Sequence, residues 1–80
     1  MTTDTVVLYS AGWCGDCRRA KSWLTTNAIP FTEIDVENDP ESRAIAMALA
    51  EGRRTIPVLL LPGGGVLVEP TNAELATALG

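Results

Sequence analysis

The sequence predicts an α/β fold with elements in the order β-α-β-α-β-β-α, in which helices flank a four-stranded mixed sheet. Two observations predict it. Short β-rich apolar runs alternate with segments of helical spacing, and a Gly-rich turn joins two neighbouring apolar runs near the end. The first β-α-β unit is expected to be parallel and the hairpin antiparallel. Eighty residues allow one domain, which we expect to span residues 1–80.

The first half of the chain contains two predicted strands separated by a helix. Residues 6–9 (VVLY) are a short β-rich run that suits a buried strand. Residues 17–27 are predicted to form an amphipathic helix, which Pro30 prevents from continuing. Residues 31–37 alternate polar and apolar side chains, and their charges suit a strand at the edge of the sheet. The helix is indicated by apolar residues at helical spacing: Ala20, Trp23, Leu24 and Ala28.

A second helix is predicted after the edge strand. Residues 38–41 (NDPE) combine a capping side chain, a proline at the first helical position and an acid in the first turn. The alanine-rich segment that follows continues the helix to Glu51, and Gly52 is predicted to stop it.

The last third of the chain is predicted to form a hairpin and a helix. Residues 55–61 and 66–68 are the two strands, joined by a turn at 62–65. Thr71 and Glu74 fit a capping box, which predicts the start of the final helix.

Composition limits the possible functions. The net charge of −4 argues against general binding to nucleic acids or anionic membranes. Aromatic residues make up 5% of the chain, too few for a surface on which bases stack. The N-terminus resembles no secretory signal, and the longest apolar run, residues 56–62, is too short to span a bilayer. We therefore expect a cytoplasmic protein with no nucleic-acid or membrane partner.

The chain has two cysteines, Cys14 and Cys17. A disulfide that closes so small a loop adds little stability, which disfavours a purely structural role. The absence of histidine disfavours a zinc site within one chain, and no metal site is expected. A C-x-x-C pair beside a β-α-β pattern instead indicates thiol–disulfide exchange. An inert pair and a metal shared between chains are the alternatives.

The cysteine pair is predicted to lie where a strand leads into the N-terminus of a helix. Unpaired backbone N–H groups and the helix dipole stabilise an anion such as a thiolate there. Because the thiolate is the species that attacks disulfides, Cys14 at the cap is predicted to be the exposed nucleophile. Cys17, about one turn further on, is the predicted resolving thiol, and the spacing allows a local disulfide.

The acid between the cysteines has two opposite effects. Asp16 favours the first turn of the helix, but its charge opposes ionisation of the neighbouring thiol. Five of the six basic residues lie at positions 18–21 and 53–54. We expect them to form one basic flank near the cysteines that offsets Asp16 or holds an anionic group of the substrate. A solvated helix face is the simpler explanation.

The segment WCGDC at residues 13–17 resembles the active-site motif of thioredoxin-superfamily reductases, and RTIP at 54–57 resembles the T-V-P segment of glutaredoxins. The length and element order are similar to the small glutaredoxin-type, thioredoxin-like fold over essentially the whole chain. Residues 52–57 and 70–75 most resemble the mycoredoxins, which depend on mycothiol. The latter segment stands where glutathione-dependent members carry a Gly-Gly pair followed by an acid, and this departure puts glutathione in doubt.

This resemblance implies roles for individual residues. Cys14 and Cys17 would be the catalytic nucleophile and the resolving thiol. Pro57 would follow a cis peptide bond that turns the Ile56 backbone toward a thiol ligand. Basic side chains and the backbone N–H groups at the start of the last helix would hold other parts of the thiol. The residues implied in thiol binding are Trp13, Gly15, Asp16, Lys21, Arg54, Thr55, Ile56, Pro57, Thr71 and Asn72.

The implied activity is the reduction of mixed disulfides between protein cysteines and a low-molecular-weight thiol. No cofactor would be bound, and mycothiol or glutathione would serve as co-substrate. The implied partners are that thiol, thiolated client proteins and, in one version of the cycle, a disulfide reductase. We expect the protein to be a monomer.

Two alternatives stay open at this point. One is a dithiol electron donor reduced by thioredoxin reductase, although such relatives carry a tryptophan near the last helix and none follows Trp23 here. The other is a dimer that shares a 2Fe–2S cluster held by Cys14 of each chain and two small thiols.

Overall fold

The computed structural model describes residues 4–80. Residues 1–3, which belong to the predicted domain and N-terminal segment, lie outside this range. The predicted element order is confirmed. The elements are β1 (Val6–Ser10), α1 (Gly15–Thr26), β2 (Phe31–Asp35), α2 (Pro40–Leu49), β3 (Val58–Leu60), β4 (Val66–Val68) and α3 (Asn72–Leu79).

The four strands form one mixed sheet in the order β2-β1-β3-β4. β1 pairs in parallel with β2 and antiparallel with β3, and β3 and β4 form the antiparallel hairpin. β2 therefore lies at the edge of the sheet, as its alternating charged side chains predict. The two central strands, β1 and β3, are the most buried, because both of their faces are covered.

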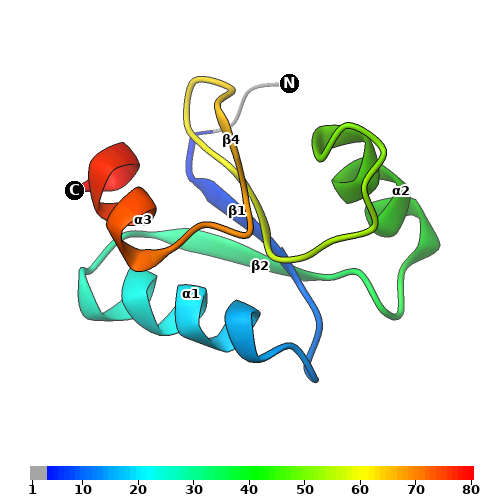
Figure 1. Cartoon of the computed structure of the whole chain (residues 1–80), viewed down its shortest axis with the longest axis horizontal. Helices are drawn as coiled ribbons and strands as arrows, with labels where there is room; N and C mark the ends of the chain where they lie inside the picture. Colours follow the sequence, from blue (N-terminus) through cyan, green and yellow to red (C-terminus); the bar gives the residue numbers. More distant parts are fainter. Residues whose placement is uncertain (1–3) are drawn as a thin grey trace.

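Helices cover both faces of the sheet, with α1 and α3 on one side and α2 on the other (Figure 1). Alternating residues of the central strands point to opposite faces, so each face has its own core. The first core contains Val6, Leu8, Ala20, Leu24, Leu59 and Leu75. The second contains Tyr9, Val36, Ala46, Ala50, Val58 and Leu60.

Two predicted boundaries differ from the structure in ways that matter for the site. α1 begins at Gly15 rather than Cys17, because Cys14 already acts as the N-cap. β3 begins at Val58 rather than Thr55. Pro57 has no N–H group to donate to a ladder, so the preceding residues leave the sheet and form a loop. That loop lies beside the start of α1, where it forms one wall of the cleft described below.

The remaining helix ends follow the predicted signals. Asp39 caps α2 by accepting a hydrogen bond from the Glu41 N–H at 3.1 Å. The capping box of α3 is complete: Thr71 Oγ1 accepts from the Glu74 N–H at 3.1 Å, and the Thr71 N–H donates to Glu74 Oε1 at 2.9 Å. α2 ends at Leu49, shortly before Gly52, whose φ of +87° suits glycine.

Within residues 4–80, no helix has the length and apolar character needed to cross a membrane.

The position of α3 depends on one buried side chain. Leu75 is the only buried residue of that helix, and it lies in the core shared with α1. We expect Leu75→Ala to lower the free energy of unfolding by about 2–5 kcal/mol, because it removes apolar contacts and leaves a cavity. Urea denaturation measures this change. Leu79→Ala, at a partly buried position of the same helix, is the matched control and should cost clearly less; an equal loss would contradict the assignment.

Candidate active site

The turn between β1 and α1 places Cys14 at the N-cap of the helix. Cys14 Sγ accepts a hydrogen bond from the Cys17 backbone N–H at 3.1 Å. The Cys14 N–H donates to the Ala11 carbonyl oxygen at 3.1 Å, and the Arg18 guanidinium donates to the Gly12 carbonyl oxygen at 2.8 Å. These bonds hold the sulfur against the positive end of the helix dipole, where a thiolate is stabilised.

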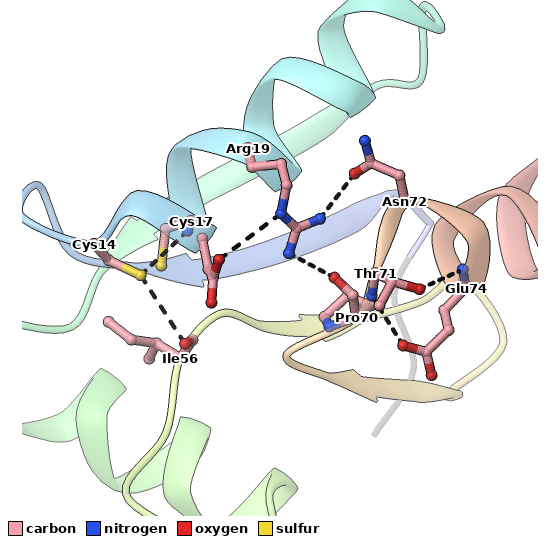
Figure 2. Close-up of polar contacts among 9 residues, drawn as sticks. Cys14, Cys17, Arg19, Ile56, Pro70, Thr71, Asn72 and Glu74 are labelled. Carbon is pink, nitrogen blue, oxygen red and sulfur yellow. Dashed lines mark hydrogen bonds and ion pairs between the residues drawn. The ribbon is translucent and has the colours of Figure 1, made fainter.

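Both cysteines are free thiols, and both are buried. The exposed fractions are 7% for Cys14 and 2% for Cys17, so the prediction of an exposed Cys14 is wrong. The sulfur is covered because the loop before β3 lies over it, with Cys14 Sγ 4.0 Å from the Ile56 carbonyl oxygen (Figure 2). The two cysteines differ in access instead: Cys14 lines a cleft that Cys17 does not reach.

The two cysteines also differ in their surroundings. Burial raises the pKa of Cys17 from its ordinary value of 9.0 to about 12, and the neighbouring Cys14 and Asp16 add to this effect. Cys17 therefore keeps its proton at neutral pH and is a poor nucleophile in the reduced protein. This assigns the first attack on a disulfide to Cys14.

The cleft beside Cys14 has a volume of about 340 Å³. Six of the ten predicted thiol-binding residues line it: Trp13, Gly15, Asp16, Arg54, Thr55 and Ile56. Trp13 is 69% exposed and stands at the cleft as a large apolar surface. The peptide bond between Ile56 and Pro57 is cis.

The structure adds one residue to the cleft that sequence reasoning missed, Glu69. Its N–H donates to the Pro57 carbonyl oxygen at 2.8 Å, which ties the end of β4 to the loop that covers Cys14. The sequence signal at this position is weak, since Glu69 simply precedes Pro70 in what reads as a connection between a strand and a helix.

Besides Pro57, three predicted binding residues do not line the cleft. Lys21 Nζ forms an ion pair with Glu33 Oε1 at 2.8 Å, which together with a hydrogen bond from Ser10 lowers the pKa of Glu33. The Thr71 N–H is taken by Glu74 in the capping box. Asn72 Oδ1 accepts from the Arg19 guanidinium at 2.8 Å. Each of these groups already has a partner within the fold, so none is directed at a ligand beside Cys14.

Arg19 connects the cysteine helix to the start of α3 (Figure 2). Besides its bond to Asn72, its guanidinium donates to the Pro70 carbonyl oxygen at 2.8 Å, and its Nε lies 3.8 Å from Asp16 Oδ1. The expected single basic flank is therefore not formed. The α1 cations bind Gly12, Asp16 and neighbouring elements, and of the five only Arg54 lines the cleft.

A second, larger cleft adjoins the first. It has a volume of about 490 Å³ and shares Trp13, Arg54, Thr55 and Ile56 with the smaller one. Its far wall is formed by α2, and its lining is mostly apolar with three arginines: Arg43, Arg53 and Arg54.

Comparisons with known proteins agree with this arrangement. The glutaredoxin family profile matches residues 6–66. A Mycobacterium tuberculosis protein named as a glutaredoxin is 32% identical over 79 residues, which cover 99% of this chain and 94% of that protein. A glutaredoxin structure from Archaeoglobus fulgidus superposes with a TM-score of 0.83 at 18% identity, covering 98% of this chain and 89% of that one. A buckwheat glutaredoxin–glutathione complex superposes with a TM-score of 0.67 at 27% identity, covering 80% of this chain and 59% of that one.

The fold and the cysteine pair at the start of α1 define a thiol–disulfide oxidoreductase with a thioredoxin-like fold. The profile match and the mycobacterial relative narrow this class further. The chain belongs to the glutaredoxin family, whose members use a low-molecular-weight thiol.

The burial of Cys17 predicts a specific pH dependence of stability. Between about pH 9 and about pH 12 the unfolded chain loses the Cys17 proton while the folded protein retains it, so this contribution to stability falls as the pH rises. Between about pH 8 and about pH 10.5, the free energy of unfolding of the reduced protein should fall by about 1–2 kcal/mol more than that of the Cys17→Ser variant. Urea denaturation at both pH values measures this difference. Identical pH slopes for the two proteins would contradict it.

Proposed function

We propose that this protein reduces mixed disulfides between protein cysteines and a small thiol, and that the small thiol is mycothiol. The observation that carries the proposal is the placement of Cys14. Its sulfur accepts the Cys17 N–H at the start of α1 and opens on a cleft of about 340 Å³, large enough for part of a small thiol and too small for a folded protein.

The cleft offers backbone and side-chain groups to the small-thiol half of the disulfide. The Ile56 carbonyl oxygen faces the Cys14 sulfur at 4.0 Å, so a cysteine-like ligand attached there can pair with the Ile56 backbone. Arg54 is the one cation that lines the cleft, and it forms no ion pair among residues 4–80. The client protein then lies outside the cleft that holds the small thiol. The larger cleft, lined by α2, adjoins this site.

The reaction starts with the Cys14 thiolate. It attacks the small-thiol sulfur of the mixed disulfide, a bond forms between the two sulfurs, and the client sulfur leaves as a thiolate that takes a proton from water. The client is thereby reduced and Cys14 carries the small thiol. A second small thiolate attacks that adduct, releasing the symmetrical small-molecule disulfide and restoring the Cys14 thiolate.

A second route uses Cys17. Its sulfur can attack Cys14 in the adduct, release the small thiol and leave a Cys14–Cys17 disulfide, which another reductant must reopen with two electrons. Burial raises the pKa of Cys17 in the reduced protein, which supports the route in which a small thiol resolves the adduct.

The choice of mycothiol rests on the segment after β4. Residues 70–75 resemble the corresponding segment of mycoredoxins. The relative whose sequence is matched over 94% of its length comes from a mycobacterium. At the start of α3 the Thr71 N–H is taken by Glu74, and the Arg19 guanidinium binds Asn72 Oδ1.

Substitution of the two cysteines tests the reaction. With a mixed-disulfide substrate and excess small thiol, Cys14→Ser should lose activity by at least about a thousandfold, because the nucleophile is gone. Cys17→Ser, the matched control, should keep most of its activity, because a second small thiol can resolve the adduct without Cys17. A Cys14→Ser protein that still reduces the substrate would remove the proposed function. Loss of activity in Cys17→Ser alone would point to the intramolecular disulfide.

The identity of the thiol is tested by parallel assays. One client peptide carrying either mycothiol or glutathione in disulfide linkage is offered to the protein, each with its own thiol as reductant. We expect the value of kcat/KM to be higher for mycothiol by about tenfold or more, since discrimination by a cleft reflects differences in transition-state binding. A preference for glutathione would refute mycothiol and leave the oxidoreductase activity in place.

A further inference from the structure

We propose that Glu69 determines which small thiols the site accepts, by placing an unpaired negative charge in the cleft beside Cys14. The favoured class is an uncharged thiol that bears hydroxyl groups, and the disfavoured class is a thiol that brings a carboxylate into this cleft. The proposal rests on the function proposed above and specifies its substrate class.

The Glu69 carboxylate is free to act on a ligand. It lines the cleft with Cys14, and it takes part in none of the ion pairs found among residues 4–80. Asp16, the other acid of the cleft, lies 3.8 Å from the Arg19 guanidinium, which partly offsets its charge. Arg54 is the only cation that lines the cleft, so two carboxylates face one guanidinium.

The backbone of Glu69 is fixed beside the cleft. The Glu69 N–H donates to the Pro57 carbonyl oxygen at 2.8 Å, so the residue is tied to the loop that covers the Cys14 sulfur. Its φ is +47°, a left-handed conformation in which glycine or asparagine is usual and glutamate is not. The Arg19 guanidinium donates a hydrogen bond to the carbonyl oxygen of the next residue, Pro70, at 2.8 Å. The exposed side chain of Glu69 therefore starts from a fixed point on one wall of the cleft.

Specificity follows from repulsion as well as attraction. A thiol that brings a carboxylate near Glu69 meets a like charge, whereas hydroxyl groups can donate hydrogen bonds to it. Glutathione, a tripeptide with two carboxylates, falls in the disfavoured class. Mycothiol, a sugar-based thiol without a carboxylate, falls in the favoured one.

The test compares Glu69→Gln with wild type on mixed disulfides of one client peptide with mycothiol and with glutathione. Loss of the charge should raise the kcat/KM of the glutathione substrate relative to that of the mycothiol substrate by about three- to tenfold, because repulsion of the carboxylates is removed. The gain should shrink at about 1 M salt, which screens charges. Glu51→Gln is the matched control: it removes the same charge from a residue with φ of +58° that lines neither cleft. An equal change for both substrates, or none, would overturn the role of Glu69.

A second measurement does not depend on turnover. The rate of alkylation of Cys14 is measured with iodoacetate, an anion, and with iodoacetamide, its uncharged counterpart. Glu69→Gln should raise the iodoacetate-to-iodoacetamide rate ratio by about three- to tenfold, and Glu51→Gln should not. If wild type reduces neither mixed disulfide, the proposed function fails, and this ratio still decides whether Glu69 repels anions at Cys14. An unchanged ratio in Glu69→Gln refutes the inference.

Discussion

The hydrogen bond from the Cys17 backbone N–H to Cys14 Sγ is the contact on which the rest of the site depends. It starts α1, whose Ala20 and Leu24 then pack into the core under the sheet. The same bond presents the sulfur to the positive end of the helix dipole. Structure and reactivity therefore share one interaction, because the group that caps the helix is also the nucleophile. Cys17 lies one turn further along the helix, and its burial there raises its pKa.

Charge in this protein is divided between building the fold and shaping the cleft. Most cations near the cysteines have structural partners: Lys21 pairs with Glu33 on the edge strand, and Arg19 joins α1 to the start of α3. What is left at the cleft is one guanidinium, Arg54, and two carboxylates, of which Glu69 is unpaired. Cys14 thus lies beside one acid and one guanidinium that form no ion pair, rather than in a purely basic pocket. The charge of the site depends on which charged side chains remain without an ion-pair partner in the fold. The spacing of residues in the sequence does not reveal which ones these are.

The sequence predicted much of the fold because its signals are local. Proline at the start of α2 and the capping box of α3 act on neighbouring residues, so both helix starts were found where predicted. The boundaries that differed depend on contacts between distant segments. β3 starts at Val58 rather than at the predicted Thr55, because the preceding loop leaves the sheet and lies over Cys14. The same covering loop buries Cys14, which helix position alone predicted to be exposed.

By itself, the sequence determined the order of elements, the mixed sheet and the cysteine pair at a helix start, because periodicity, caps and the C-x-x-C spacing are properties of adjacent residues. Only the tertiary structure decided which residues share the cleft. Arg54 and Ile56 lie beside Cys14 although they are about forty residues away in sequence, and Glu69 also lines the cleft. Lys21, Thr71 and Asn72 instead form contacts within the fold. The physical reason is that contacts between segments distant in sequence set which side chains line the cleft and which pair elsewhere in the fold.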